Sequence, residues 1–319
     1  MFYLCVTKGE LLVSILSVEE LEKYREAGNI AAQVMRRAKK IITKGRKLIY
    51  ICDVLENEIR KFDAEPAFPL NVSVNQIAAH YTSPIDDELT LPERSIVKID
   101  LGARVDGYIS DHAKTFIVGG TKTYLKLKKG AELALEKAIE FIKPGVRPGE
   151  IGEVIENTIR KNNLTPITDL SGHIIERWKL HTGTSIPNSK PRLGFLGPKL
   201  KVGQVVAIEP FVTTSDGSEK IYDESYSYIF SQIGTKAKSK DAKKILEKIE
   251  EYNSLPFALR WLEGLLSETK LFSALKELIS YNSINRYPML VSKSHTPVSQ
   301  AEHTIIITES GCEIITQIK

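Results

Sequence analysis

The sequence predicts an α+β protein built from two related halves. Three observations support this class: helical and strand-like apolar patterns alternate along the chain, one stretch is repeated later in the sequence, and acidic residues interrupt strand-like runs in both halves. Elements of this kind pack as strands that lie together with helices covering the outside. A site that both halves contribute to would lie between them.

The chain opens with helical patterns and then a strand. Ser17 and Glu20 have the S-x-x-E form of a capping box, and apolar residues recur at helical spacing from about Val18 to the low forties. A second amphipathic segment, LIYICDVLENEIRK, ends before Pro66. The segment PLNVSVNQI (69–77) then alternates as a strand with one exposed face does.

A hairpin is predicted next. Two β-rich runs between residues 95 and 119 are joined at Val105-Asp106-Gly107, and Asp-Gly is a usual hairpin turn. Asp100 and Asp111 lie on opposite arms. Their side chains converge if the register places them on one face.

Helices are expected from about Thr121 to Ile142 and from Gly149 to Asn162, and the second of these repeats the earlier amphipathic segment. When Gly45 is aligned with Gly145, no gap is needed. The identical positions are Ile51/Ile151, Val54/Val154, Glu56/Glu156, Asn57/Asn157, Ile59/Ile159, Arg60/Arg160 and Lys61/Lys161. This pattern indicates an internal duplication.

Helical periodicity runs through residues 239–283, between the segments that carry Glu209 and Glu302. We expect a helical insertion, residues 239–285, with its own apolar core. The expected core residues are Leu246, Ile249, Phe257, Leu259, Trp261, Leu262, Leu265, Leu275 and Leu278. A DNA-reading role is disfavoured because the stretch contains many glutamates.

Composition excludes several classes of protein. The chain has 319 residues, 42% of them apolar, so it can bury a large core. Its net charge of +4 comes from interleaved acidic and basic residues, which argues against nucleic-acid binding. Cys5, Cys52 and Cys312 form no C-x-x-C pair, which argues against disulfides and a cysteine zinc site. No secretory signal or membrane-length apolar run is present, so we expect a cytoplasmic protein.

Four carboxylates, Asp100, Asp111, Glu209 and Glu302, are the candidate functional groups. Three of them interrupt buried-strand patterns, where an unpaired charge costs several kcal/mol. Few basic residues lie beside them in the sequence, whereas His173 in LSGHIIERW adds an imidazole. Oxygen ligands with imidazole favour divalent metal, and this set suffices for two ions. Structural salt bridges remain the alternative.

The motifs IDLGARVDGYISDHAKTF, LSGHIIERWKLHTGTSIPN, AIEPF and AEHTI resemble, in order and spacing, those of the methionine aminopeptidases of family M24. The resemblance covers residues 18–319 as one catalytic domain and leaves residues 1–17 as an N-terminal extension of uncertain order. It implies the pita-bread fold: two pseudo-twofold α+β halves around a curved antiparallel sheet. The insertion containing LPFALRWLEGL is similar to that of type II enzymes, and the lack of a long polybasic extension is similar to the archaeal members.

The resemblance also implies roles for the metal ligands. Asp111 and Glu302 would bridge two divalent ions, His173 and Glu209 would complete one site, and Asp100 would chelate the other. Cobalt, manganese, iron and zinc all tolerate this ligand set. A hydroxide bridging the two ions would attack the first peptide carbonyl, and Glu209 would move the proton to the leaving amine.

Further roles concern the substrate. His181 would bind the carbonyl oxygen, and His80 would contact the scissile amide nitrogen. Residues matching the methionine pocket are Phe68, Pro69, Asn71, Leu180 and Tyr287, although simple packing explains each of them equally well from the sequence. His112, His295 and His303 match no role and are expected to be structural or exposed.

The activity implied is removal of the initiator methionine from nascent chains with a small second residue. We expect a monomer that meets the ribosome transiently and binds neither DNA nor membrane. Two alternatives stay open: a Xaa-Pro dipeptidase or aminopeptidase of the same fold, and a catalytically silent relative that binds RNA or ribosomes. The type II insertion and the presence of all five ligands argue against them.

Overall fold

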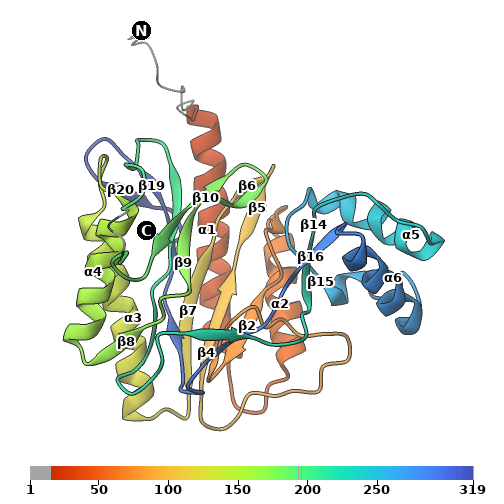
Figure 1. Ribbon diagram of the computed structural model, residues 1–319, viewed down its shortest axis with the longest axis horizontal. Coiled ribbons are helices and arrows are strands. Elements are labelled where there is room, and N and C mark those ends of the chain that lie inside the picture. Colours follow the sequence, from red (N-terminus) through yellow and green to blue (C-terminus); the bar gives the residue numbers. More distant parts are fainter. Residues whose placement is uncertain (1–15, 193, 195, 319) are drawn as a thin grey trace.

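The computed structural model describes residues 16–192, 194 and 196–318 and shows a central group of strands flanked by helices, with a small helical unit to one side (Figure 1). The predicted N-terminal extension therefore lies almost entirely outside the described residues, as does Cys5. Within the described part of the chain, none of the helices is both long and apolar enough to span a membrane.

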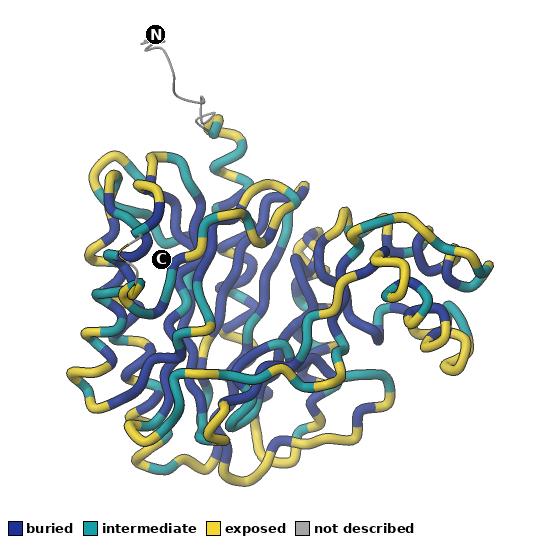
Figure 2. Tube along the Cα trace, in the orientation of Figure 1, coloured by how far each residue is buried: buried dark blue, intermediate teal, exposed yellow. Residues whose placement is uncertain are grey.

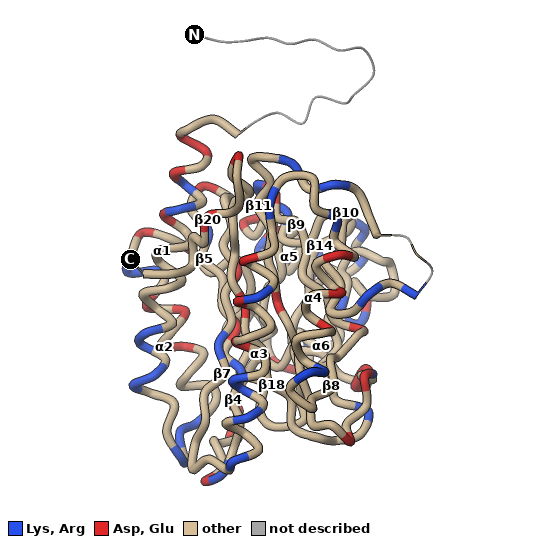
Figure 3. Tube along the Cα trace, turned by 90° about the vertical axis from the view of Figure 1, so that its left-hand side faces the viewer, with Lys and Arg blue, Asp and Glu red and all other residues tan. Residues whose placement is uncertain are grey.

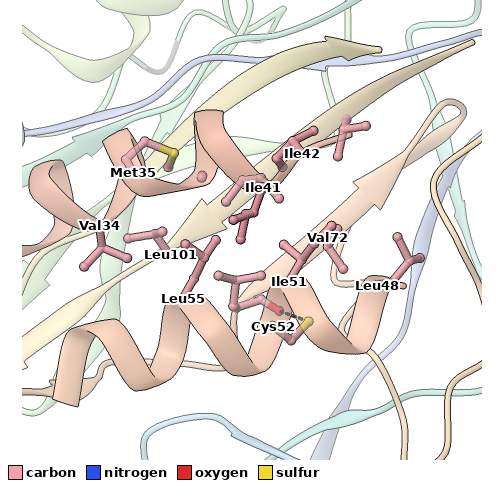
Figure 4. Packing of buried hydrophobic residues seen from close by; sticks show 14 of the residues in the cluster. Val34, Met35, Ile41, Ile42, Leu48, Ile51, Cys52, Leu55, Val72 and Leu101 are labelled. Atoms are coloured by element: carbon pink, nitrogen blue, oxygen red, sulfur yellow. Dashed lines mark hydrogen bonds between the residues drawn. The ribbon is translucent and has the colours of Figure 1, made fainter. Parts of the chain in front are cut away.

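Helix α1 (Val18–Ile41) begins at the predicted capping box. Glu20 N–H donates to Ser17 Oγ at 3.2 Å, and Ser17 N–H donates to Glu20 Oε2 at 2.8 Å. Helix α2 (Leu48–Arg60) follows. Figure 4 shows both helices packing their apolar faces together and against strands, with Val34 of α1 and Leu55 of α2 in one buried cluster. The predicted helices are confirmed.

The first-half sheet has the order β2-β4-β7, formed by β2 (Asn71–Val74), β4 (Ser95–Leu101) and β7 (His112–Val118). The expectation that β2 has an exposed face is wrong, because Asn71, Val72 and Ser73 are all buried. Val72 packs into the α1–α2 cluster on one face. The polar side chains of Asn71 and Ser73 belong to the other face, which the rest of the molecule covers.

The predicted hairpin is present but is divided between two sheets. Asp106 and Gly107 form its turn with φ of 49° and 85°, as a type I′ turn requires. The inner pieces β5 (Ala103–Val105) and β6 (Tyr108–Ile109) pair with each other, and β5 also pairs with β1 (Glu65–Pro66). The outer pieces β4 and β7 pair with each other in the first-half sheet. Asp111 therefore lies just before β7 rather than within a strand.

The second half repeats this plan with α3 (Lys122–Phe141) and α4 (Pro148–Lys161) covering a five-stranded sheet. That sheet has the order β10-β9-β11-β19-β20. Its strands are β9 (Ser171–Glu176), β10 (Lys179–Pro187), β11 (Val205–Ile208), β19 (His303–Ile307) and β20 (Cys312–Ile314). Charged residues of both signs are interspersed over the molecule (Figure 3), as the composition suggested.

The internal duplication is visible in the hydrogen bonds of the two helix–helix turns. Gly45 N–H donates to Leu91 O at 2.8 Å, and Leu91 N–H donates to Arg46 O at 2.9 Å. In the second half, Gly145 N–H donates to Leu200 O and Leu200 N–H to Val146 O, both at 2.8 Å. Both glycines have positive φ, so the two turns are structural equivalents.

The insertion has its own apolar core and is attached by a three-stranded sheet, β15-β14-β16. It is not helical throughout, because the residues between α5 (Lys240–Ile249) and α6 (Glu268–Ser280) form two short 3₁₀ turns and a strand. These elements are η1 (Glu250–Tyr252), β15 (Phe257–Ala258) and η2 (Leu259–Leu262), and the partner strands are β14 (Ile229–Gln232) and β16 (Ile284–Tyr287). Every predicted core residue belongs to this cluster or packs against it.

Two further small sheets close the molecule, with orders β18-β12-β8 and β13-β17-β3. Their strands are β3 (Ile77–Ala79), β8 (Leu164–Pro166), β12 (Phe211–Thr214), β13 (Ile221–Asp223), β17 (Leu290–Ser292) and β18 (Ser299–Gln300). Figure 2 shows the central strands buried and the outer loops exposed. Strand ends from the two halves meet inside the molecule, where Glu302 N–H, just before β19, donates to Ala113 O of β7 at 2.9 Å.

Candidate metal centre and substrate cavity

Three of the five candidate ligands form a compact buried cluster. Asp111, His173 and Glu302 each offer one ligand atom, and these atoms lie within 4.8 Å of one another. All three residues are at most 5% exposed. His173 lies on β9, while Asp111 and Glu302 immediately precede β7 and β19, so both halves of the molecule contribute.

The other two candidates adjoin this cluster. Asp100 lies on β4 opposite Ala113 of β7, and its carboxyl group interacts directly with that of Asp111. Glu209 directly follows β11. Gln300 Nε2 donates to Glu209 Oε2 at 3.3 Å and to Glu302 Oε2 at 3.4 Å. The structure thus brings together the five residues that the sequence suggested.

The carboxyl groups lack compensating positive charge. The pKa values of Asp100, Glu209 and Glu302 are raised well above the usual range, mainly by burial and secondly by the neighbouring carboxylates. Burial also raises the pKa of Asp111 to about 7. Among the described residues, neither lysine nor arginine forms an ion pair with them. The structural salt-bridge alternative therefore has no support.

The donor set fits divalent metal ions. Asp100 Oδ1, Asp111 Oδ1 and Glu302 Oε1 are buried oxygens without a hydrogen-bond partner. Buried polar atoms are normally satisfied, so such orphaned oxygens point to an unseen partner. Carboxylate oxygens with one imidazole are suitable ligands for several divalent metals.

Backbone contacts hold the two halves of the cluster in place. Thr304 Oγ1 accepts from Asp111 N–H and donates to Asp111 O, both at 2.7 Å. His112 Nδ1 donates to Glu302 O at 2.7 Å, and the His112 ring stacks on that of His303 at 4.8 Å. These two histidines are structural, and His295 is exposed, as expected.

A cavity of about 320 Å³ opens beside the cluster and joins the metal ligands to the other predicted residues. Asp100, Asp111, His173 and Glu209 line it, whereas Glu302 is not among the lining residues. The remaining predicted site residues also line it: Phe68, Pro69, Asn71, His80, Leu180, His181 and Tyr287. Several of them are apolar or aromatic, so one part of the cavity suits an apolar side chain.

His80 is held in an unusual conformation. Its φ of 64° lies in the left-handed region, which is costly for a residue with a side chain and clusters at functional sites. Nδ1 donates to Pro288 O at 3.2 Å, and the ring contacts Tyr287 edge-on. Burial lowers the pKa of His80 to about 4, so the neutral ring has Nε2 as an acceptor.

His181 lies where the pairing of β10 with β9 is irregular, between Lys179 and Thr182. Such bulges redirect side chains. The His181 ring lies 4.4 Å from the His173 ring, centroid to centroid. Burial, and then His173, lower the pKa of His181.

The structure adds residues that the sequence reasoning missed. Gln300 is the shared hydrogen-bond donor to two candidate ligands, and its position two residues before Glu302 on a strand-like stretch was an available signal. Pro256 of the insertion and Asp169 also line the cavity. Neither had a sequence signal, because both reach the cavity only through folding.

A buried cluster of carboxylates and imidazole, set between duplicated α+β halves and beside a substrate-sized cavity, defines a metal-dependent hydrolase. The sequence model of metallopeptidase family M24 matches residues 22–260, and the chain belongs to this family. Membership implies divalent metal ions as cofactors.

Curated relatives agree with this assignment. The chain is 42% identical to a methionine aminopeptidase of Methanothermobacter thermautotrophicus over 303 residues, which cover 94% of this chain and 100% of the relative. It is also 42% identical over 304 residues to one from Methanocaldococcus jannaschii, covering 95% and 100%.

Solved structures confirm the predicted pita-bread fold. The methionine aminopeptidase of Thermotoga maritima aligns with a TM-score of 0.71 and 26% identity, covering 96% of this chain and 100% of that one. A thermophilic Arx1 aligns with a TM-score of 0.81 at 20% identity, covering 95% and 92%, and shows the fold alone. A prolidase of Pyrococcus furiosus aligns with a TM-score of 0.62 at 18% identity, and this chain covers 66% of it.

Proposed function

We propose that this protein is a type II methionine aminopeptidase that removes the N-terminal methionine from peptides and nascent proteins with a small second residue. One observation carries the proposal: four of the five candidate ligands line one cavity together with His80 and His181, and the fifth, Glu302, adjoins it in the cluster with Asp111 and His173. The chain that holds them aligns over nearly its whole length with methionine aminopeptidases. We expect it to act as a cytoplasmic monomer that meets the ribosome transiently.

The ligands are assigned to two divalent ions. Asp111 and Glu302 would bridge them, His173 and Glu209 would complete one site, and Asp100 would complete the other. Divalent ions held by these residues would supply Lewis-acid polarisation of the scissile carbonyl and a nucleophile at neutral pH. Cobalt, manganese, iron and zinc are the candidates.

The protein's own residues supply proton transfer and orientation. Glu209 accepts the proton of the attacking water and returns it to the leaving amine, and the Gln300 amide holds its Oε2 in place. The Nε2 lone pair of His80 accepts the scissile amide N–H, because Nδ1 already donates to Pro288 O. His181 donates to the carbonyl oxygen as negative charge develops there.

Peptide release tests the proposal. Met-Ala-Ser, Met-Leu-Ser and Met-Pro would each be incubated with the apoprotein, with each candidate metal added, and finally with chelator. We expect Met-Ala-Ser to be cleaved faster than Met-Leu-Ser, and chelator to stop the reaction. Preferential cleavage of the proline dipeptide would identify a dipeptidase, and no metal-dependent release from any peptide would identify a catalytically silent member.

A further inference from the structure

A buried ion pair joins the insertion to the first half of the molecule. Arg260 of η2 and Glu56 of α2 are 7% and 2% exposed, and Arg260 Nη2 donates to Glu56 Oε1. Trp261 Nε1 donates to Glu56 Oε2 at 2.8 Å. Buried pairs are weak evidence for stability alone, because desolvation offsets much of the attraction. The informative feature is what else these two residues bind.

The pair belongs to a closed ring of hydrogen bonds around Leu70. Glu56 Oε1 accepts Leu70 N–H at 3.0 Å, and Thr82 Oγ1 donates to Leu70 O at 2.7 Å. Arg260 Nη1 donates to Thr82 Oγ1 at 2.6 Å, which closes the ring through the insertion. Leu70 precedes β2, so this ring, not strand pairing, holds both backbone polar groups of Leu70.

The ring lies directly behind the wall of the cavity. Pro69 and Asn71, on either side of Leu70, both line the cavity. Thr82 comes two residues after His80, which also lines it. A shift of Leu70 or Thr82 would therefore move the groups that face the first substrate residue.

The duplicated counterpart of Glu56 behaves differently. Glu156 of α4 accepts from Arg160 Nε at 2.8 Å and from Lys190 N–H at 3.0 Å, with its side chain 22% exposed. Neither contact leads to the cavity beside the metal ligands. Of the two equivalent glutamates, only Glu56, in the half that the insertion covers, is thus buried and connected to that cavity.

We propose that Glu56 and Arg260 are positioning residues that set the geometry of the subsite for the first substrate side chain, so that the insertion controls selectivity without touching substrate through either residue. The inference rests on the proposed function only in taking that side chain to be methionine. A displaced residue in a substrate-binding pocket lowers selectivity even where the catalytic groups are intact.

Kinetics with matched variants test this role. We expect Arg260→Met and Glu56→Gln to raise KM for Met-Ala-Ser about tenfold and to reduce the preference for Met-Ala-Ser over Leu-Ala-Ser by about tenfold, with a smaller change in kcat. Arg260→Lys should recover part of the preference. Glu156→Gln, the duplicated control, should change neither quantity.

Hydrogen exchange of the Leu70 amide gives a readout independent of turnover. We expect faster exchange in metal-free Arg260→Met than in the wild type, and no change in Glu156→Gln. An unchanged exchange rate of the Leu70 amide would overturn the proposal. So would variants whose activity falls only in proportion to the folded fraction, with KM and the preference for Met-Ala-Ser unchanged. If Arg260→Met does not fold, Arg260→Lys and Glu56→Gln carry the same readouts.

A wild-type protein that released no methionine would refute the proposed function, whereas Leu70 exchange would still test the positioning.

Discussion

At the scale of single residues, the clustered carboxylates determine most of the chemistry of the site. Asp111, Glu209 and Glu302 lie at the ends of strands: Asp111 and Glu302 directly precede β7 and β19, and Glu209 directly follows β11. In the proposed mechanism, Glu209 alone both holds a metal ion and moves a proton. Gln300 supports it and Glu302 through a single amide group.

Replacing Glu209 with glutamine tests the proposed base. Glu209→Gln keeps the shape of the side chain but cannot accept a proton, so we expect kcat for Met-Ala-Ser to fall by about 10²–10⁴-fold. The melting temperature and circular dichroism should show an intact fold. Full activity in the folded variant would remove Glu209 from the mechanism.

Replacing Gln300 tests the supporting amide. Gln300→Leu removes the donor shared by two carboxylates, and we expect metal affinity to fall by about 10–100-fold, because groups behind the ligands orient them. Titration calorimetry with each candidate metal measures this change. Gln232→Leu is the matched control, since the Gln232 amide donates to Gly234 O at 3.3 Å and to none of the candidate ligands, and it should bind metal as the wild type does.

At the scale of secondary-structure elements, the division of one hairpin between two sheets shapes the cavity. Gly102 separates β4 from β5, and a Cβ atom there would lie 2.4 Å from Ser110 O and 2.5 Å from Phe68 Cε1. Phe68 lines the cavity. The absence of a side chain at Gly102 therefore lets Phe68 approach the hairpin.

Gly102→Ala should destabilise the protein by about 1–3 kcal/mol, because the added methyl group meets both backbone and an aromatic ring. It should also raise KM for Met-Ala-Ser, since Phe68 must move. Denaturant unfolding and steady-state kinetics measure the two effects. Gly183→Ala is the matched control for stability, because nothing lies within 4 Å of its added Cβ. Equal unfolding free energies for the two variants would contradict the expected close contact.

At the scale of the whole molecule, two duplicated halves and an insertion meet around the metal centre. The metal-free centre brings acidic groups together away from water, so folding raises their pKa and disfavours their ionised forms. Bound cations would favour the ionised forms and stabilise the fold.

The melting temperature should therefore depend on metal and pH together. The pKa of Asp111 is about 7 in the folded metal-free protein, against an ordinary value of 3.8, so the folded state binds more protons than the unfolded state between these values. Stability of the chelated protein should fall as pH rises through this window. We expect the difference in melting temperature between metal-loaded and chelated protein to widen from about pH 5 to pH 7, measured by calorimetry. A constant difference would argue against these carboxyl groups as the ligands.

Local patterns accounted for much of the architecture. The capping box at Ser17, the Asp106-Gly107 turn and the repeat that aligns Gly45 with Gly145 depend on neighbouring residues, and each is present in the structure. The burial of β2 was mispredicted, because alternation along one strand does not show what packs on its second face. The interior of the insertion was likewise less helical than its periodicity indicated.

The sequence alone was sufficient for the fold class, the family and the residues worth testing, because periodicity, duplication and motif spacing are properties of the chain itself. The convergence of Asp100, Asp111, His173, Glu209 and Glu302 beside one cavity depends on register between strands far apart in sequence, so only the folded molecule shows it. The same holds for Glu56 and Glu156. They are equivalent in the repeat, but only Glu56 meets Arg260, because the insertion packs on one half alone.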